Sequence, residues 1–300
     1  MENYERKKIN LLTFDIEEWF IEKTWFGGRQ ERYYEFDCLL DRLLEMLGEH
    51  KISATFFCLG KVAEEFPYVI RKIADAGHEI GCHSYQHQWI NKMTPYEFRE
   101  DTYAAISMLE NVVGQKVVSF RAPAFSIGEG NKWAFEILAE SGIQNDASIF
   151  PIVRDLGGFP NFLEHKPCVI LYNGVKINEF PIQTYKLPII GKEIVYSGGG
   201  YFRLLPLLFI KKQIAVNDYT MCYFHIADLL TQKIPLKSKK EYESYFKEKG
   251  TFTRRVVRYM KTNIGKKHAL SNLEDLLAEY RFCSIREYLK VNKLSTNIEL

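Results

Sequence analysis

The feature that most constrains the fold of this chain is the alternation of short apolar runs with segments of helical periodicity. Residues 9–14, 54–59, 79–82 and 117–120 are apolar runs of strand length, and helical patterns lie between them. Alternation of this kind predicts parallel strands that are covered by helices. A chain of 300 residues fits one large α/β barrel of this type or two small domains.

Several element boundaries follow from the local sequence. Residues 94–97 (Thr-Pro-Tyr-Glu) have the capping-box pattern with proline at the first helical position, and they predict a helix that runs to about Val113. Residues 62–76 are predicted to form one helix, and residues 271–289 an amphipathic helix that closes the chain. One more barrel strand is expected over residues 219–224.

Composition and charge exclude several classes of protein. Hydrophobic residues make up 46% of the chain and charged residues 26%, which favours a large buried core over disorder. A net charge of +2 is too balanced to indicate a nucleic-acid binder. The first ten residues are polar, and no apolar run has the length of a signal peptide core or a membrane span. The six cysteines form no Cys-x-x-Cys pair, so we expect reduced thiols in a cytoplasmic protein.

Chemically versatile side chains follow the predicted strands directly. Asp15 and Glu17 come at the end of the first strand, His83 after the third, Arg121 after the fourth and His225 after the last. The carboxyl ends of parallel barrel strands open on one face of the molecule, where active sites are built. These side chains are therefore expected to converge although they are far apart in the sequence.

The spacing of His83 and His87 suggests a metal site. Two imidazoles four residues apart lie on one face of a helical turn, where they can hold a divalent ion together. A third ligand would come from elsewhere, and Asp15 and Glu17 are both available. Two histidines and one carboxylate leave coordination positions open for water and substrate, as a catalytic metal requires. Two unrelated surface histidines can have the same spacing, so the pair alone does not decide.

The chain resembles the polysaccharide deacetylases with the NodB-type homology domain, also called carbohydrate esterase family 4. The segments that carry the resemblance occur in the family's order and spacing: residues 13–15 (Thr-Phe-Asp), 54–57 (Ala-Thr-Phe-Phe), 77–81 (Gly-His-Glu-Ile-Gly), 83–87 (His-Ser-Tyr-Gln-His) and 121–123 (Arg-Ala-Pro). Two later segments, residues 146–151 (Asp-Ala-Ser-Ile-Phe-Pro) and 198–203 (Gly-Gly-Gly-Tyr-Phe-Arg), resemble the branch found in exopolysaccharide gene clusters.

This resemblance implies an α/β fold, a distorted (β/α) barrel of about seven parallel strands. It implies a single domain over residues 1–300, with core motifs in residues 9–225 and a C-terminal helical extension over residues 226–300. The implied activity is N-deacetylation of N-acetylhexosamine units in a polysaccharide or its precursor. It uses one divalent metal ion, with zinc as the default and cobalt, nickel or iron also compatible with the ligand types.

The resemblance also implies roles for individual residues. Asp15 matches the general base, and Arg121 matches the arginine that holds this base through a bidentate pair. His83 and His87 match the metal-binding pair, and His225 matches the general acid.

The third metal ligand and the residue that orients the general acid are assigned less directly. The better-known branch has a second aspartate after the base, but this chain has Ile16 there. The third ligand is therefore expected at Glu17, which alternation along a strand places on the same side as Asp15. The neighbouring Glu18 is interpreted as a solvent-facing acid. Asp146 is expected to orient the general acid.

Further segments indicate partners. An aromatic cluster in residues 19–34 can line a groove for an N-acetylated glycan or serve ordinary barrel packing. The stretch from Lys233 to His268 is rich in Lys and Arg, and can contact an anionic glycan, a lipid-linked precursor or a membrane surface, or form a solvated face. Alternative functions are hydrolysis of a small non-sugar amide, an inactive sugar-binding homologue, and an iron oxygenase with the same ligand types.

Overall fold

The computed structural model describes residues 8–153, 157–188, 191, 193–246 and 248–300. The polar start of the chain, residues 1–7, on which the absence of a signal peptide was inferred, lies outside these residues. Seven parallel strands lie side by side in the described part of the chain. In spatial order they are β10 (Met221–His225), β1 (Asn10–Ile16), β2 (Thr55–Cys58), β3 (Glu79–Cys82), β4 (Ser119–Phe120), β5 (Asn145–Asp146) and β7 (Val175–Glu179). The α/β fold with parallel strands predicted from the sequence is confirmed.

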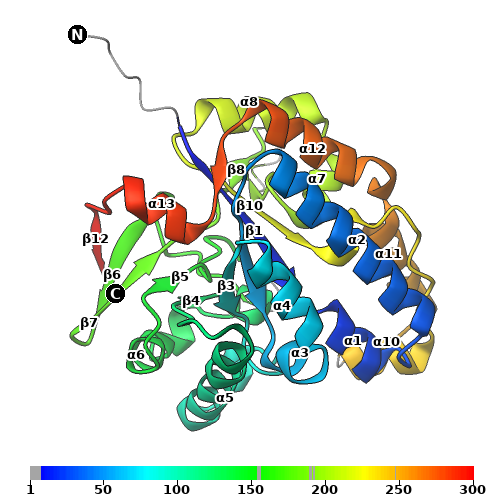
Figure 1. Ribbon diagram of the computed structural model, residues 1–300, viewed down its shortest axis with the longest axis horizontal. Coiled ribbons are helices and arrows are strands. Elements are labelled where there is room, and N and C mark those ends of the chain that lie inside the picture. Colours follow the sequence, from blue (N-terminus) through cyan, green and yellow to red (C-terminus); the bar gives the residue numbers. More distant parts are fainter. Residues whose placement is uncertain (1–7, 154–156, 189–190, 192, 247) are drawn as a thin grey trace.

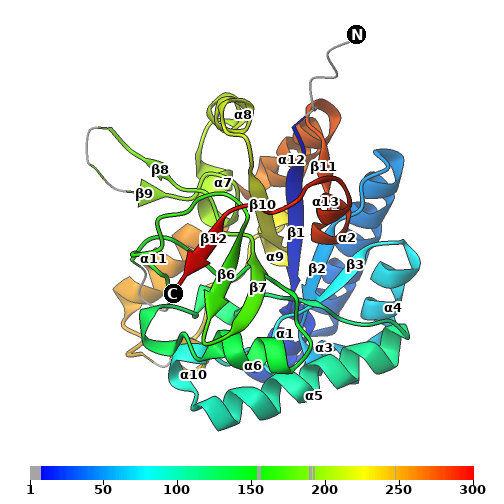
Figure 2. The same ribbon diagram turned by 90° about the vertical axis from the view of Figure 1, so that its left-hand side faces the viewer.

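The remaining strands extend this sheet or stand beside it. Beyond β7 lie β6 (Cys168–Tyr172), which is antiparallel to it, and β12 (Asn297–Glu299). The short strand β11 (Phe282–Cys283) pairs with the beginning of β1. The strands β8 (Tyr185–Lys186) and β9 (Glu193–Ile194) form a separate hairpin, which projects beside α7 and α8 in Figure 2. Among the described pairings none joins β7 to β10, so the curved sheet is open there.

Helices cover the outer face of the sheet, as Figure 1 shows. In chain order they are α1 (Glu18–Trp25), α2 (Gln30–Glu49), α3 (Gly60–Glu65), α4 (Pro67–Asp75), α5 (Pro95–Val113) and α6 (Ala134–Glu140). The capping box predicted for α5 is present, since the Thr94 hydroxyl accepts from the Glu97 amide at 3.2 Å and the Glu97 carboxylate accepts from the Thr94 amide at 2.7 Å. This helix ends at Gly114, whose φ of 67° is the left-handed conformation that glycine adopts without strain.

The other helices surround β10 or follow it. They are α7 (Gly199–Leu204), α8 (Leu207–Val216), α9 (Ile226–Leu229), α10 (Lys239–Phe246), α11 (Phe252–Asn263), α12 (Ala269–Glu279) and α13 (Ile285–Val291). Single 3₁₀ turns occur at Ile90–Lys92, Pro123–Phe125, Glu129–Asn131 and Lys266–His268. No helix in the described part of the chain is both long and apolar enough to span a bilayer.

Two helix predictions are wrong in detail. Residues 62–76 do not form one helix, because Pro67 lacks an amide hydrogen and begins a new helix, α4, after a break at Phe66. Residues 271–289 are divided among α12, β11 and α13, and α13 has its own N-cap at Ser284. The C-terminal extension over residues 226–300 is therefore not purely helical, since β11 and β12 join the main sheet.

Candidate active site

The register of β1 and β10 brings the first acidic residues next to the last histidine. Asp15 and His225 are paired across the two parallel strands, and Glu17 follows where β1 ends. The Nε2 atom of His225 lies 3.5 Å from Glu17 Oε1 and 3.9 Å from Asp15 Oδ2. Both carboxylates are buried, whereas 32% of the His225 side chain is exposed. The histidine is thus the accessible member of this group.

Arg121 holds Asp15 in a fixed position. Its Nη1 donates to Asp15 Oδ1 at 2.8 Å, and its Nε donates to the Ala147 carbonyl at 3.2 Å. The guanidinium is fully buried and lies 4.3 Å from the centre of the Phe57 ring. A buried arginine with this many contacts cannot turn away, so it fixes the orientation of the Asp15 carboxylate.

Glu17, His83 and His87 form a compact group of metal-ligand type. One candidate ligand atom from each lies within 4.8 Å of the others. Glu17 Oε2 is 2.7 Å from His87 Nε2 and 3.5 Å from His83 Nε2, yet this buried oxygen accepts no well-aligned hydrogen bond. Burial would raise the pKa of the Glu17 carboxyl, but His87 and then His225 hold it well below its ordinary value. A buried anionic oxygen facing two imidazole nitrogens fits a divalent cation.

The hydrogen bonds of the two histidines favour the same use. His83 Nδ1 donates to the Arg121 carbonyl at 2.8 Å, so the lone pair of its Nε2 faces Glu17. The predicted helical turn is wrong, because residues 83–88 form no helix, and Ser84 and His87 have φ of 69° and 62°. The Ser84 hydroxyl accepts from the His87 amide at 3.1 Å, which closes a tight loop. This loop turns both imidazoles toward Glu17.

Asp228, rather than Asp146, holds the ring of His225. Asp228 Oδ2 lies 3.0 Å from His225 Nδ1, and its Oδ1 lies 3.2 Å from Arg203 Nη1. Burial alone would lower the pKa of His225, but the nearby carboxylates, that of Glu17 first, raise it well above its ordinary value. The expectation that Asp146 orients this histidine is corrected, because an acid three residues further along the chain does so at the start of α9.

Asp146 instead belongs to a buried pair with Glu179. The two residues are neighbours in the register of β5 and β7, and both are fully buried. Asp146 Oδ1 accepts from the Ser148 hydroxyl at 2.5 Å, and Glu179 Oε1 accepts from the Ile149 amide at 3.2 Å. Burial raises the pKa of both carboxyls, and the charge of Asp146 raises that of Glu179 further. Two adjacent buried carboxyls can avoid repulsion by sharing a proton.

The shared proton gives a testable pH dependence of stability. The pKa of Glu179 is higher in the folded state than its ordinary 4.5, so its stabilisation is complete below about pH 4.5 and is lost as the pH rises through the folded value. Glu179→Gln replaces the proton with amide hydrogens. Between pH 5 and pH 8, we expect wild type to lose about 1–3 kcal/mol of unfolding free energy relative to this variant, as measured by urea unfolding. Parallel profiles would contradict the shared proton, and Glu31→Gln, at an exposed position, is the matched control.

The sequence analysis placed Glu18 incorrectly. It is buried rather than solvent-facing, and its Oε1 accepts from the Ala227 amide at 2.8 Å in the first turn of α9. Burial and the charge of Glu17 raise its pKa to about 7. Glu18 therefore ties the end of β1 to the helix that follows His225.

The aromatic cluster divides between the core and the site. Trp19 is fully buried, whereas Trp25 and Phe26 lie against Tyr245, with ring centres 5.3 and 5.7 Å apart. Burial, followed by the charges of Glu17 and Glu18, raises the pKa of the Tyr245 hydroxyl. Helix α10, which carries Tyr245, thus forms a wall beside Glu17 and Glu18. No local pattern in the sequence indicates Tyr245, whereas Asp228, three residues after His225, forms a helix-start pattern with it.

Two family models match the chain, one in each half. The model described as polysaccharide deacetylase matches residues 2–145, and the model described as Domain of unknown function (DUF3473) matches residues 147–290. The first part contains Asp15, the Glu17–His83–His87 group and Arg121, and the second contains His225. The side chains of the candidate site therefore come from both matched segments.

Similar proteins have been described as deacetylases. A Bacillus cereus peptidoglycan-N-acetylglucosamine deacetylase is 36% identical over 32% of this chain and 35% of its own length. An Azorhizobium caulinodans chitooligosaccharide deacetylase is 36% identical over 26% of this chain and 38% of its own length, so this chain spans well under half of either relative. A candidate polysaccharide deacetylase from Mycobacterium smegmatis shares the fold, with a TM-score of 0.64 and 18% identity over 99% of this chain and 96% of its own.

Proposed function

Because the chain belongs to the polysaccharide deacetylase family, we propose that it is a metal-dependent N-deacetylase that acts on N-acetylhexosamine units of a polysaccharide or its precursor. The observation that carries this proposal is the position of the Glu17–His83–His87 group beside two further elements. One is the buried pair of Asp15 and Arg121, and the other is the exposed His225. Hydrolysis of an amide needs a base, an acid and stabilisation of the oxyanion, and these groups offer all three within one site.

The ligand set assigns the metal to three residues. Glu17, His83 and His87 would hold a divalent ion, for which zinc is the default, while cobalt, nickel and iron are also compatible. When bound, such an ion lowers the pKa of water and polarises the acyl oxygen. Glu17 contributes one negative charge to the ion, and His83 is fixed in the required tautomer by its bond to the Arg121 carbonyl.

The side chains around this position divide the proton transfers between them. Asp15 takes a proton from the water that attacks the acetamide carbonyl, and Arg121 keeps its carboxylate aimed at that water. His225 donates a proton to the leaving amine, while Asp228 holds the ring from its other nitrogen. The carbon–nitrogen bond breaks, and acetate and a free amino sugar result. The Asp228 carboxylate beside Nδ1 favours the protonated ring, which suits an acid that must hold a proton before the amine leaves.

Acetate release tests the proposal directly. Purified protein is treated with a chelator, re-supplied with zinc or cobalt, and incubated with N-acetylglucosamine oligomers beside a His83→Ala variant. We expect release that depends on metal and falls by about 10³-fold or more in the variant, because several kcal/mol of transition-state stabilisation is lost and each 1.36 kcal/mol is a factor of ten. Metal binding without acetate release, together with turnover of small amides, would favour the non-sugar amidase instead. No release and no bound metal would contradict the proposal.

A further inference from the structure

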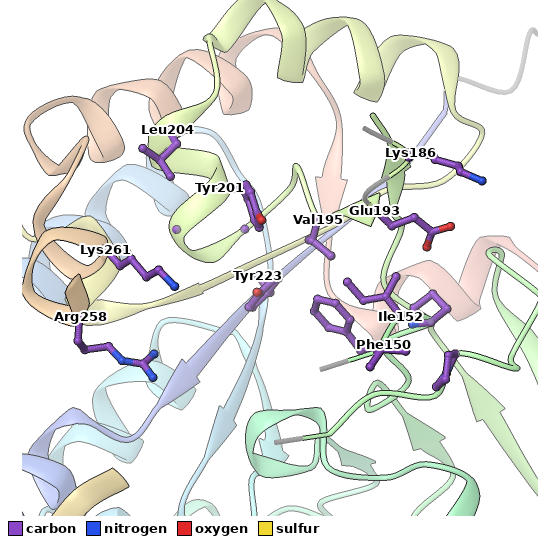
Figure 3. A pocket seen from close by; sticks show the side chains of 16 residues that line it. Phe150, Ile152, Lys186, Glu193, Val195, Tyr201, Leu204, Tyr223, Arg258 and Lys261 are labelled. Atoms are coloured by element: carbon purple, nitrogen blue, oxygen red, sulfur yellow. The ribbon is translucent and has the colours of Figure 1, made fainter. Parts of the chain in front are cut away.

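A large cavity lies next to the catalytic group, which consists of Asp15, Glu17, His83, His87, Arg121 and His225. The cavity is formed by parts of the chain that have no role in the proposed reaction. Its volume is about 830 Å³, within the range of ligand pockets. Residues 150–153 form one wall, and residues 198–204 form another. These walls overlap the two later segments, 146–151 and 198–203, that the sequence analysis singled out. Neither segment contributes a residue to the catalytic group. Figure 3 shows Phe150, Tyr201 and Tyr223 around the cavity.

Tyr223 connects this cavity to the catalytic group. It lines the cavity, while its ring centre lies 6.4 Å from that of His225 and 5.9 Å from the Arg121 guanidinium. Gly198 lies against Tyr223, and a Cβ atom there would come within 2.3 Å of the ring. Glycine at this position therefore allows the 198–204 wall to lie directly on the tyrosine. A glycan whose acetamide occupied the catalytic group could extend over Tyr223 into the cavity.

The charges in the cavity are unequally distributed. Among the described residues that line it, Lys186, Arg258 and Lys261 are basic and Glu193 is the single acid. Lys186 and Glu193 are paired in the register of the β8–β9 hairpin, so their charges offset each other. Figure 3 shows them at the opposite end of the cavity from Arg258 and Lys261. The end formed by α11 is therefore the cationic end.

Arg258 and Lys261 carry their charges without an acidic partner among the described residues. They are three residues apart on α11, and neither forms an ion pair within the described part of the chain, although the Arg258 side chain also contacts the Tyr242 hydroxyl. The Arg258 guanidinium lies 4.4 Å from the centre of the Phe246 ring, which supports it without neutralising it.

We propose that this cavity is a subsite for an anionic group of the glycan, a sugar carboxylate or a phosphate, bound by Arg258 and Lys261 while Tyr201 contacts the sugar ring. This inference rests on the proposed function and narrows its substrate to acidic N-acetylated glycans. Aromatic rings beside cationic side chains suit such a ligand, because the rings contact the apolar faces of a sugar and the cations form charge-assisted hydrogen bonds with its anionic group.

Equilibrium binding to the full-length, metal-supplied protein tests the subsite. The probes are a neutral N-acetylglucosamine tetramer, a tetrasaccharide of alternating glucuronate and N-acetylglucosamine, and UDP-N-acetylglucosamine, measured by calorimetry at low salt. We expect at least one anionic probe to bind about tenfold more tightly than the neutral tetramer, with the preference reduced at 0.5 M salt. Preference for the glucuronate probe assigns a sugar carboxylate, and preference for the nucleotide sugar assigns a phosphate.

Two double variants separate the subsite from net charge. Arg258→Gln with Lys261→Gln is expected to remove the tenfold preference. Arg254→Gln with Lys249→Gln removes the same charge from exposed positions nearby and should retain the preference. Equal binding of all three probes, or equal losses in both double variants, would overturn the proposal. So would binding to phosphatidylglycerol vesicles that only the first double variant loses, without any preference among the probes, since the two cations would then serve a membrane surface.

Acetate release from the same probes is measured in parallel. Its absence from every probe would overturn the deacetylase function, whereas the preference in binding and its loss in the first double variant test the subsite itself. The two failures are therefore distinguishable.

Discussion

Asp15→Asn is expected to lower kcat for acetate release by about two to four orders of magnitude, the usual contribution of a positioned general base. Asparagine has nearly the same shape but cannot take a proton from the attacking water. Asp15 is not part of the Glu17–His83–His87 group, so the bound metal should be retained. Steady-state kinetics and metal analysis of the same preparation check both expectations.

The control for this variant addresses stability. Removing the charge of Asp15 leaves the Arg121 guanidinium buried without its partner, and breaking a buried pair in this way costs about 3–5 kcal/mol. The double variant Asp15→Asn with Arg121→Gln removes both charges and should recover part of that loss without recovering activity. A folded, metal-loaded protein in either form with kcat within tenfold of wild type would show that Asp15 is not the base.

The second large effect is a loss of metal affinity, which we expect from only one of two adjacent glutamates that receive the same substitution. Glu17→Gln should weaken metal binding by roughly 100-fold or more, since even changes outside the ligand set cost about 10–100-fold. Glu18→Gln should retain the metal, because the Glu18 carboxylate is directed to the Ala227 amide and a glutamine oxygen can accept the same bond. Competition with a chromogenic chelator measures both affinities. Equal losses in the two variants, or a loss only in Glu18→Gln, would assign the third ligand differently.

Local signals made part of the fold predictable. The strand Glu79–Cys82 was placed to the residue, and the helix that begins after Thr94 was predicted from its capping box alone. In both cases the information lies within a few consecutive residues. The prediction of one helix over residues 62–76 is wrong although the signal is local, because Pro67 begins a new helix. The prediction of one helix over residues 271–289 is wrong because β11 pairs with β1, and no local pattern indicates this pairing.

The site was predictable in composition but not in detail. Residues at strand ends converge because parallel strands share one direction, and this placed Asp15 and His225 correctly beside each other. The loop that carries His87 could not be predicted, because a spacing of four suggests a helix while the chain uses left-handed conformations. Asp228 holds His225 through a local helix-start contact, whereas the place of Asp146 depends on pairing with Glu179 on a strand distant in sequence. The cavity could not be predicted from local patterns either, since its lining residues come from many segments between Phe150 and Lys261.

The pairing of β1 with both β10 and β11 has a consequence for how the protein is made. Leu11 pairs with Met221 in one neighbour, and Asn10 pairs with Phe282 in the other. At a synthesis rate of 5–20 residues per second, β1 waits roughly 10–50 s for these partners after it leaves the ribosome. The edge of β1 that pairs with β10 stays unpaired in that interval, whereas β2, which follows early in the chain, can pair with its other edge. The strand that carries Asp15 is thus made long before the strand that carries His225, and the candidate site assembles only after β10 has been made.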